Sequence, residues 1–596
     1  MCGIVGCVGR PDETLDVLMT GLSNLEYRGY DSAGVALSNE ALSVEKRAGE
    51  LEELENAVRT TSLHGNVGVG HTRWSTHGAP TDANAHPHTD CSERVAVVHN
   101  GIIENYAELK NELQARGHTF ESETDTEVLP HLVEEYLEAG TDPESAVREA
   151  IGRIEGSYAV GVVVAGVDAI FAAREDSPLV IGVADDEFHL ASDVPAFLDY
   201  TDRVVYLDDG EFATLRPGGL TVMDAEGTPI EKPVETVDWD TEDTGKGGYD
   251  HYMLKEIHEQ PQAIRQCLSG RVDELRGRVE LEELDRLARP QRVQFVACGT
   301  SYHAGLYAAH LFREMGIPAQ TFIASEYATS PPPVDEDELV VAITQSGETA
   351  DTLSALREAK ARGAETLALT NVVGSSVTRE CDHTMYIRAG PEIGVAASKT
   401  FTSQLVAVNL LVEAMNGNDA GVLTGLRDLA GDLQSVLDRV DVTAAAERLA
   451  AAERCFFVGR GLNHPVALEG ALKFKEITYV HAEGFPAGEL KHGSLALVTD
   501  ETPVVAVLTG DGEETQKTIG NIKEVESRGA PVIAVTDGQV ELEGYVDEVI
   551  EVPATHAHVA PLLANAVLQL IAYRSADLLG RSIDKPRNLA KSVTVE

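Results

Sequence analysis

The sequence has few basic residues, and this shortage limits the partners that the protein can have. Its 596 residues include 47 Lys and Arg but 98 Asp and Glu, for a net charge of −51. Because such a surface repels nucleic-acid phosphates and anionic lipid headgroups, we expect neither a nucleic acid nor a membrane as a partner. The acidic residues are spread along the chain, which favours a protein of a salt-rich cytoplasm, where ions screen the self-repulsion. An ordinary acidic enzyme is the alternative.

Cysteines and long apolar runs are also scarce. The seven cysteines are odd in number and form no C-x-x-C pair, which favours a reducing cytoplasm: Cys2, Cys7, Cys91, Cys267, Cys298, Cys381 and Cys455. No charged and apolar leader follows Met1, so we expect no secretory signal. The most apolar stretch, residues 559–573, contains Pro561 and is shorter than the ~20 residues of a bilayer span. It predicts a buried core helix.

The length favours about three or four domains, and the pattern changes along the chain. Residues 2–235 contain many short β-branched runs and only two clear helical patterns, at 105–116 and 126–139. Many strands with few helices predict a layered α+β domain. A stretch rich in Pro, Gly and acidic residues follows at 226–250, and we assign the linker to residues 236–250.

From Val293 onward, the pattern is strand, Gly/Ser turn and helix, repeated several times. This alternation predicts parallel sheets with helices on both faces. Residues 295–301 resemble 456–462, and 341–349 resemble 505–513 at a matching interval. The match indicates a duplication, although chance similarity of glycine turns is the alternative. We therefore expect two tandem α/β lobes and a helical connection, at residues 251–415, 441–596 and 416–440, respectively.

A cysteine at position 2 becomes the N-terminal residue if Met1 is removed. Its α-amine, with an ordinary pKa of about 7.7–8.0, can then take the proton of a thiol with a pKa of about 8.5. An inert, buried cysteine beside a first strand is the alternative. Three further groups favour a nucleophile. Asn100-Gly101 at a strand tip suits an oxyanion hole, Arg73 suits a substrate carboxylate, and Asp125 suits an ammonium group. Together they describe a site for hydrolysing the amide of glutamine.

Six motifs resemble the glutaminase domain of class II (N-terminal nucleophile) amidotransferases, in the family order: M-C-G-I-V-G, Y-R-G-Y-D-S-A-G, H-T-R-W-S-T-H-G, N-A-H-P-H, H-N-G-I-I-E-N and S-E-T-D-T-E. The resemblance implies a layered αββα domain. It also implies that Cys2 is the nucleophile and that Asn100 and Gly101 form the oxyanion hole. The glutamine-binding residues it implies are Arg73, Trp74, Thr76, His77 and Asp125, with Trp74 gating the passage of ammonia.

Several histidines in this region raise the question of a metal. They are His71, His77, His86, His88 and His99. They lack the tight paired spacing of a zinc site, and no cysteine pair accompanies them. We expect structural or substrate-shaping roles for them, and neither a metal nor another cofactor.

Hydroxyl side chains gather at two strand ends in the first lobe. The run Thr344-Gln345-Ser346-Gly347-Glu348-Thr349 follows an apolar strand and opens a helix, and Ser301 follows the preceding strand. Backbone N–H groups and hydroxyls at a helix N-terminus bind anions, so we predict a phosphate site. Ordinary N-capping is the alternative, but it needs only one hydroxyl. The corresponding run 509–514 carries carboxylates that repel phosphate, so we expect one site per chain.

With E-I-G-V-A-A-S-K-T, A-L-E-G-A-L-K-F-K-E, A-G-E-L-K-H-G and D-K-P-R-N-L-A-K-S-V-T-V-E, these motifs resemble the sugar isomerase (SIS) domains of the glutamine–fructose-6-phosphate aminotransferase family. The resemblance runs essentially from end to end. It implies conversion of fructose 6-phosphate and glutamine to glucosamine 6-phosphate and glutamate, the first step of amino sugar synthesis.

The same resemblance implies roles for residues of the second lobe. Lys591 forms a Schiff base with C2 of the sugar, and Glu476 moves a proton between C1 and C2. His492 opens the sugar ring and comes from the partner subunit of a homodimer, and Lys473 assists at the hydroxyls. The implied sugar-phosphate-binding residues are Ser301, Thr344, Gln345, Ser346, Thr349, Val395 and Glu469.

Glu469, Lys473 and Glu476 are spaced i, i+4 and i+7, so one helix presents all three on one face. A solvated, salt-bridged face is the alternative, but the small apolar residues around them favour packing. Two rival functions stay open. A class II amidotransferase with another acceptor would need a pyrophosphate or ATP loop, and we find neither. A non-catalytic sugar-phosphate sensor would tolerate the loss of Cys2, Glu476 and Lys591, yet all three are present.

Overall fold

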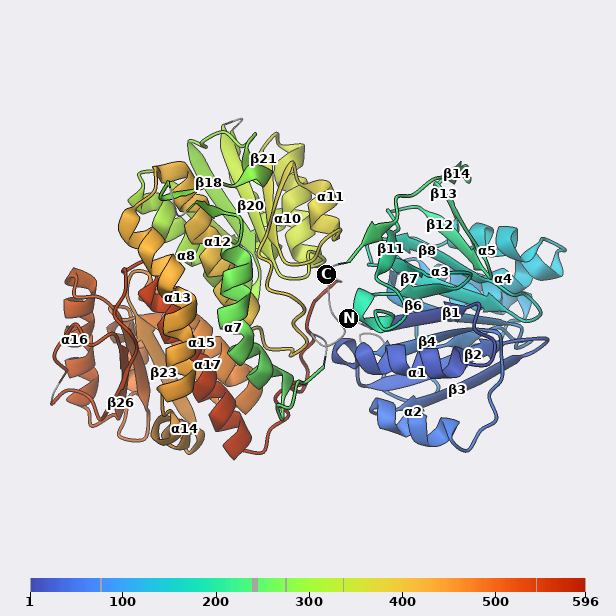
Figure 1. Cartoon of the computed structure of the whole chain (residues 1–596). Coiled ribbons are helices and arrows are strands. Elements are labelled where there is room, and N and C mark those ends of the chain that lie inside the picture. Colours follow the sequence, from blue (N-terminus) through green and yellow to red (C-terminus); the bar gives the residue numbers. More distant parts are fainter. Residues whose placement is uncertain are drawn as a thin grey trace. The chain divides into compact units, whose positions relative to one another are not determined.

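The computed structural model describes residues 2–74, 78–237, 245–273, 276–335, 337–542 and 544–594. The chain divides into two compact units, residues 1–244 with 590–596, and residues 245–589 (Figure 1). No helix among the described residues is both long enough and apolar enough to cross a membrane.

The first unit contains two antiparallel sheets. The larger sheet has the order β15-β11-β9-β10-β1-β4-β2-β3, with β1 (Gly3–Val8), β2 (Ser32–Ser38), β3 (Leu42–Ala48), β4 (Val67–Arg73), β9 (Val180–Val183), β10 (Phe188–Ala191), β11 (Arg203–Tyr206) and β15 (Glu235–Thr236). The other has the order β14-β13-β12-β8-β7-β6-β5, with β5 (His88–Thr89), β6 (Val95–Ile103), β7 (Gly156–Val164), β8 (Ile170–Glu175), β12 (Phe212–Arg216), β13 (Gly219–Met223) and β14 (Pro229–Ile230).

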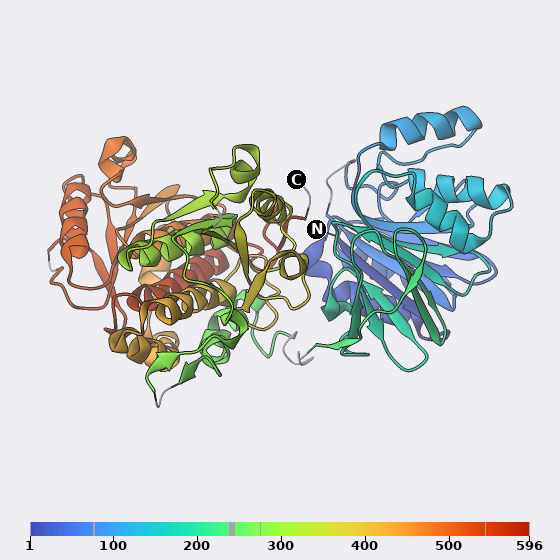
Figure 2. The ribbon, with the colours of Figure 1, turned by 90° about the horizontal axis from the view of Figure 1, so that it is seen from above.

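Helices cover the outer face of each sheet (Figure 2). The larger sheet packs against α1 (Thr14–Asn24) and α2 (Leu51–Val58), and the other against α3 (Tyr106–Arg116), α4 (Val128–Glu138) and α5 (Pro143–Ile151). Between the sheets, apolar side chains of alternating strand positions interdigitate, among them Ile4 and Val69 from one sheet and Val98 and Ile170 from the other. This arrangement confirms the expected αββα layers.

The second unit contains two parallel five-stranded sheets with the same strand order. In the first lobe the order is β19-β18-β20-β21-β22, with β18 (Arg292–Ala297), β19 (Ala319–Ile323), β20 (Glu338–Thr344), β21 (Glu365–Thr370) and β22 (His383–Tyr386). In the second it is β24-β23-β25-β26-β27, with β23 (Arg454–Gly459), β24 (His481–Pro486), β25 (Val504–Leu508), β26 (Val532–Thr536) and β27 (Glu548–Glu551). The equivalent order confirms the duplication inferred from the glycine turns.

One continuous buried core joins the two lobes, because it includes strand residues of both, such as Phe295 and Phe457. Long helices build this core: α7 (Tyr252–Leu268), α8 (Gly299–Glu314), α12 (Lys399–Asn416), α13 (Ala420–Arg439), α14 (Thr443–Ala450), α15 (Asn463–Thr478) and α17 (Ala560–Leu578). Shorter or peripheral helices are α9 (Ala324–Thr329), α10 (Ala350–Ala361), α11 (Ser376–Glu380) and α16 (Glu513–Glu526). The burial of α17 along most of its length agrees with the core helix predicted for residues 559–573.

Residues 226–237 contain regular structure that their composition did not predict. Strand β14 extends the smaller sheet, and β15 pairs with β11 at the edge of the larger one. Each is only two residues long, and a strand of two residues has no alternation from which a sequence could reveal it. Residues 238–244 of the expected linker lie outside the described residues.

Candidate active sites

Cys2 lies beside the end of strand β4. Strands β1 and β4 pair antiparallel with Gly3 opposite Thr72, so the residue before β1 reaches the residues that follow Thr72. The backbone N–H of Trp74 donates to the Cys2 sulfur at 3.3 Å, and the Trp74 carbonyl oxygen lies 3.6 Å from the same sulfur. Cys2 is half-buried, whereas Cys7 in the middle of β1 is fully buried. The fold therefore presents Cys2 at a strand end and leaves Cys7 in the core.

Asn100 on β6 contacts Cys2 directly. Its side-chain Nδ2 donates to the Cys2 carbonyl oxygen at 2.8 Å. Nε2 of His71 lies 3.0 Å from Asn100 Oδ1 and 3.1 Å from the His99 carbonyl oxygen. Because both neighbours are acceptors, His71 carries its proton on Nε2 and fixes which way the amide points. Burial lowers the pKa of His71 to about 3, so the ring is neutral.

Gly101 needs to be glycine. Its φ is +129°, and a Cβ at this position would lie 2.0 Å from the carbonyl oxygen of Ser157 on the paired strand β7. The backbone here departs from ordinary strand geometry directly after Asn100. The structure thus brings Cys2 and Asn100 together, with the Gly101 N–H next in the chain.

The two predicted charged partners of glutamine are both buried. Asp125 Oδ2 accepts the N–H of Ile103, and Arg73 Nη2 donates to the carbonyl oxygen of Gly78 at 3.2 Å. Burial lowers the pKa of the Arg73 guanidinium, while the nearby Cys2 and Asp125 oppose this shift. Arg73 therefore belongs electrostatically to the same site as Cys2.

Of the remaining predicted residues of this site, one is described by the structure and two are not. Trp74 is half-buried, and Thr76 and His77 lie outside the described residues. His71 and His86 stack with ring centroids 4.2 Å apart, and His86 meets His88 at 4.6 Å. Burial lowers the pKa of all three, so they pack as neutral rings.

The hydroxyl groups of the predicted phosphate loop, residues 344–349, form hydrogen bonds within the loop itself. It joins β20 to α10, and Ser301 lies in the first turn of α8, after the adjacent parallel strand β18. Thr344 Oγ1 accepts the N–H of Gly347 at 3.2 Å and lies 3.3 Å from Thr349 Oγ1. Ser346 Oγ accepts the N–H of Glu348 at 3.2 Å. Because carboxyl ends of adjacent parallel strands share one sheet edge, Ser301 and the 344–349 loop lie at the same edge of the sheet.

The corresponding loop of the second lobe is built differently. Gly510 N–H donates to Asp537 Oδ2 at 2.7 Å, and the Thr509 hydroxyl donates to Asn463 Oδ1 at 2.7 Å. Its carboxylates, Glu513 and Glu514, occupy the first turn of α16. Our prediction of a single phosphate site per chain rests on this difference.

An acid–base cluster lies on α15, with two side chains buried and that of Glu476 19% exposed. Lys473 Nζ is 3.4 Å from Glu469 Oε1 and 2.7 Å from Glu476 Oε2, and the side chains of Lys473 and Glu469 are 2% and 0% exposed. The alternative of a solvated salt-bridged face is therefore wrong. Burial opposes the charge of Lys473, but Glu476 and Glu469 outweigh it and raise the lysine pKa. Burial raises the pKa of Glu476 against the opposing effect of Lys473.

Comparisons with known proteins cover the whole chain. Two protein-family models match it, a glutamine amidotransferase domain at residues 71–199 and a SIS domain at residues 286–414 and 448–577. The glutamine–fructose-6-phosphate aminotransferase [isomerizing] of Halobacterium salinarum is 52% identical over 610 residues, and that of Symbiobacterium thermophilum is 50% identical over 613 residues. Both alignments cover 100% of this chain and 100% of the relative.

The chain belongs to the glutamine–fructose-6-phosphate aminotransferase family.

A solved structure supports the same assignment for the second unit. The C-terminal domain of the glucosamine-fructose-6-phosphate aminotransferase from Francisella tularensis is 36% identical, with a TM-score of 0.53. The alignment covers 57% of this chain and 99% of that domain. The tandem SIS lobes of this family are therefore present here.

The sequence did not predict two residues that contact the Glu469–Lys473–Glu476 cluster on α15. Thr300 Oγ1 donates to Glu469 Oε1 at 3.0 Å, and His303 Nδ1 lies 2.7 Å from Glu469 Oε2. Both come from α8 of the first lobe, so the cluster lies where the two lobes meet. The i, i+3 spacing of Thr300 and His303 could have placed both on one face of α8, but not beside Glu469 of the other lobe.

Three other predicted residues occupy separate segments. His492 is exposed in the short 3-10 helix Leu490–His492. The Val395 N–H donates to the Asp584 carbonyl oxygen at 3.1 Å. Lys591 is half-buried in the segment 590–596, which is grouped with the first compact unit.

Proposed function

We infer that this protein transfers the amide nitrogen of glutamine to fructose 6-phosphate, giving glucosamine 6-phosphate and glutamate. The observation that carries this inference is the presence, in one chain, of the Cys2–Asn100 arrangement and of the Glu469–Lys473–Glu476 cluster, in which Glu469 and Lys473 are buried. The first suits amide hydrolysis and the second suits proton transfer on a sugar. The full-length relatives carry the name of this reaction.

In the glutaminase half, the Cys2 sulfur attacks the amide carbonyl carbon of glutamine. Asn100 Nδ2 and the Gly101 N–H stabilise the negative oxygen of the tetrahedral intermediate, and each such donor is worth about 2.7–4 kcal/mol. Arg73 binds the substrate carboxylate and Asp125 its ammonium group. Ammonia leaves, and water releases glutamate from the thioester. Thr76 and His77 complete the proposed pocket, and Trp74 gates the passage of ammonia.

In the isomerase half, the hydroxyls of the 344–349 loop and Ser301 bind the phosphate. Gln345, Val395 and Glu469 complete the proposed sugar-phosphate site. The Lys591 amine condenses with the C2 carbonyl of the open-chain ketose, and water leaves. Ammonia then displaces the lysine at C2.

Proton transfer between the sugar carbons falls to Glu476. It removes a proton from C1 and returns one to C2, which leaves an aldehyde at C1 and an amine at C2. A carboxyl with a raised pKa can both accept and release a proton near neutral pH. Lys473 keeps Glu469 ionised beside the sugar hydroxyls, since Lys473 and His303 outweigh burial and lower the pKa of Glu469.

The assembly and compartment that we propose follow from the same family assignment. We propose a cytoplasmic homodimer in which His492 reaches the active site of the other subunit and opens the sugar ring. We also propose domain limits of 2–235 for the glutaminase domain, 236–250 for the linker, 251–415 and 441–596 for the SIS lobes, and 416–440 for their helical connection.

The test is an assay of glucosamine 6-phosphate and glutamate from the purified chain with glutamine and fructose 6-phosphate in high-salt buffer. We expect both products from the native protein and neither from Cys2→Ala. Glutamate without amino sugar would contradict the proposed acceptor and favour a class II amidotransferase with another one. If the native protein released no glutamate, a non-catalytic sugar-phosphate sensor would be favoured.

A further inference from the structure

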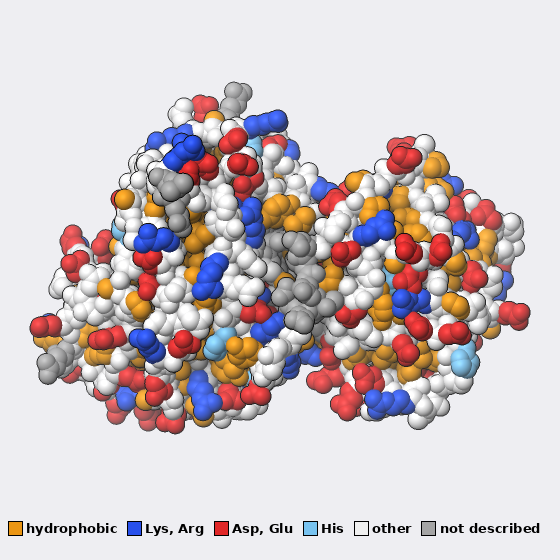
Figure 3. Space-filling model, in the orientation of Figure 1, with side chains coloured by type: hydrophobic (Ala, Val, Ile, Leu, Met, Phe, Trp, Pro, Cys, Tyr) orange, Lys and Arg blue, Asp and Glu red, His pale blue; other side chains and the backbone are white. Residues whose placement is uncertain are grey.

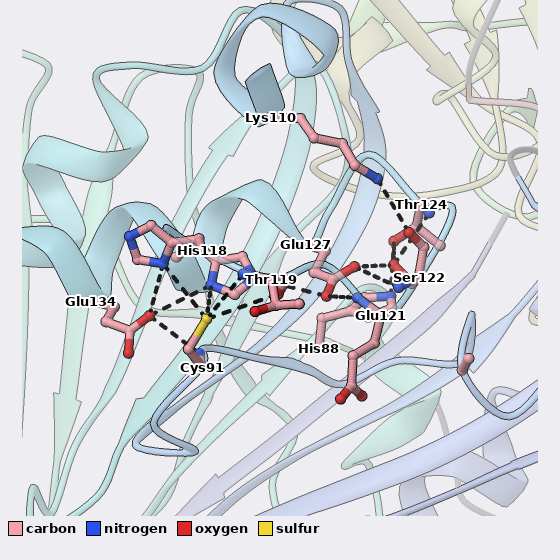
Figure 4. A network of polar contacts seen from close by, with 12 residues as sticks. His88, Cys91, Lys110, His118, Thr119, Glu121, Ser122, Thr124, Glu127 and Glu134 are labelled. Carbon is pink, nitrogen blue, oxygen red and sulfur yellow. Dashed lines mark hydrogen bonds and ion pairs between the residues drawn. The ribbon is translucent and has the colours of Figure 1, made fainter. Parts of the chain in front are cut away.

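Four side chains of the types that bind metal ions lie close together on the helix-covered side of the smaller sheet, outside the Cys2 site. They are Cys91, His118, His131 and Glu134, and one donor atom of each lies within 4.8 Å of all the others. Figure 4 shows the Cys91 sulfur, the His118 ring and the Glu134 carboxylate directed toward a common point. His131 and Glu134 are buried, whereas Cys91 is exposed, so an ion could enter from solvent.

The four residues come from three segments of the chain. Cys91 lies in the turn between β5 and β6, and His118 follows α3 directly after Gly117, whose φ is +108°. His131 and Glu134 lie three residues apart on α4 and so share one helix face. Asp90 fixes the turn that carries Cys91. Its Oδ1 accepts the N–H of Arg94 and that of Val95, the first residue of β6, both at 2.7 Å.

Four of the six distances between the donor atoms are close to those around a tetrahedral ion. Zinc bonds of about 2.0–2.3 Å place neighbouring tetrahedral donors about 3.3–3.6 Å apart. The Cys91 sulfur lies 3.7 Å from His118 Nδ1 and 3.6 Å from His131 Nδ1. Glu134 Oε2 lies 3.1 Å from His118 Nδ1 and 3.5 Å from His131 Nδ1. All four distances are close to the edges of such a tetrahedron.

The outer partners are also those of a metal site. Each histidine directs Nδ1 to the centre. His118 Nε2 hydrogen-bonds to Glu135 Oε1 at 3.0 Å, whereas His131 Nε2 lies 3.8 Å from Glu127 Oε1, which is too long for a hydrogen bond. A carboxylate behind a ligating histidine fixes its tautomer and increases its basicity. The Thr119 N–H donates to the Cys91 sulfur at 3.4 Å, as suits a thiolate ligand.

We propose that Cys91, His118, His131 and Glu134 bind one zinc ion per chain. A thiolate and two imidazoles favour zinc over magnesium or calcium, which prefer oxygen ligands. Four protein ligands fill the tetrahedral shell, so the role is structural rather than catalytic. The ion joins both ends of the segment 118–131, which carries Asp125. This site revises the expectation of no metal, which considered other histidines and looked only for closely paired ligands.

Metal binding by the full chain tests the proposal. The reduced protein is stripped with a chelator in high-salt buffer and titrated with Zn²⁺ against a chromogenic competitor. Co²⁺ is then used as a spectroscopic probe. We expect one tightly bound ion per chain and a thiolate-to-cobalt charge-transfer band. Cys91→Ser and His118→Gln should bind zinc at least about 100-fold more weakly, a larger loss than outer-shell substitutions cause. Cys381→Ser and the exposed His64→Gln are matched controls and should bind as the native protein does.

Two outcomes would overturn the proposal. One is a native chain that binds no ion tightly, in which case the four side chains only hydrogen-bond one another. The other is binding without a thiolate band, or equal binding by Cys91→Ser, which would indicate adsorption to the acidic surface. Zinc should raise the melting temperature of the native protein but not that of Cys91→Ser. Circular dichroism before titration checks that each variant is folded.

Discussion

At the scale of single residues, the two sites are set up by buried polar side chains that hold each other in place. His71 fixes the amide of Asn100, and Asn100 in turn contacts Cys2. In the sugar half, Lys473 lies between Glu469 and Glu476 and favours the charged form of both. Burial still outweighs Lys473 at Glu476 and raises its pKa, whereas Lys473 and His303 together outweigh burial at Glu469 and lower its pKa. Different protonation of two nearby carboxyls is what separates binding from proton transfer.

Replacing Glu476 tests this division of roles. Because general acid–base groups contribute about 10²–10⁴-fold, Glu476→Gln should lower kcat for glucosamine 6-phosphate by about 100-fold or more. Glutamate release from glutamine alone should be retained, since Cys2 is unchanged. Glu483→Gln, at a side chain that is 43% exposed, is the control and should leave both rates near native. Near-native amino sugar formation by Glu476→Gln would exclude this residue as the proton carrier.

The neutral state of His71 predicts a pH dependence of stability. In the unfolded chain a histidine binds a proton below about pH 6.5, whereas the folded His71 does so only near its lowered pKa of about 3. The unfolded state therefore binds more protons between these values, and stability should fall as pH falls through this window. His71→Gln should have a shallower slope of melting temperature against pH than the native chain. His64→Gln, at an exposed position, should keep the native slope, and equal slopes for all three would contradict the assignment.

At the scale of secondary-structure elements, each site is placed where strands end. Cys2 precedes β1 and meets the residue after β4, and the proposed phosphate loop follows β20. Strands β6 and β7 pair over nine residues, and this register sets the position of Asn100 and Gly101. A change in the backbone at that pairing should therefore disturb both stability and the glutaminase site.

Gly101→Ala tests whether the pairing of β6 with β7 requires glycine at this position. The added Cβ would meet the Ser157 carbonyl oxygen at 2.0 Å, at a φ of +129° that L-residues rarely adopt. We expect a loss of at least about 2 kcal/mol in the free energy of unfolding. Gly117→Ala is the matched control, because its φ is +108° but no atom lies within 4 Å of the added Cβ. Its expected loss is about 1 kcal/mol, from backbone strain alone. The measurement is a denaturant titration of each variant. Equal losses in the free energy of unfolding would contradict the expected clash between the added Cβ and the Ser157 carbonyl oxygen.

The predictability of elements from sequence follows their length and periodicity. The short β-branched runs at Ile4–Val8 and Val95–Val98 lie in β1 and β6, and the helical patterns after Asn105 and Thr126 lie in α3 and α4. Sites carried by one element were also predictable, as for the three charged residues of α15. The contribution of His303, and the Cys91–His118–His131–Glu134 cluster, depend on tertiary packing between separate segments, which single-sequence periodicity does not contain.

At the scale of the whole molecule, charge is the dominant feature. With 98 acidic and 47 basic residues, red acidic side chains are spread over the visible surface of both units in Figure 3, without gathering in a single patch. Self-repulsion of this kind destabilises a compact state and is weakened by salt. The range over which charges interact shrinks from about 10 Å at 0.1 M salt to about 3 Å at 1 M.

Stability should therefore depend on salt. We expect the melting temperature to rise steeply with NaCl between 0.1 M and several molar, and activity to be lost on transfer to low salt. Sucrose is the control, because it strengthens burial without screening charge, and it should not replace the salt. A melting temperature that does not change with NaCl would leave the chain an ordinary acidic enzyme.

The central claim is that one chain releases nitrogen from glutamine and delivers it to a sugar phosphate. The most direct measurement supplies glutamine labelled with nitrogen-15 in the amide, together with fructose 6-phosphate and an excess of unlabelled ammonium. Mass spectrometry then gives the label in glucosamine 6-phosphate. We expect a product that carries the glutamine label despite the ammonium, and no labelled product from Cys2→Ala. A product whose label is diluted to that of the bulk ammonium, or no amino sugar at all, would contradict it.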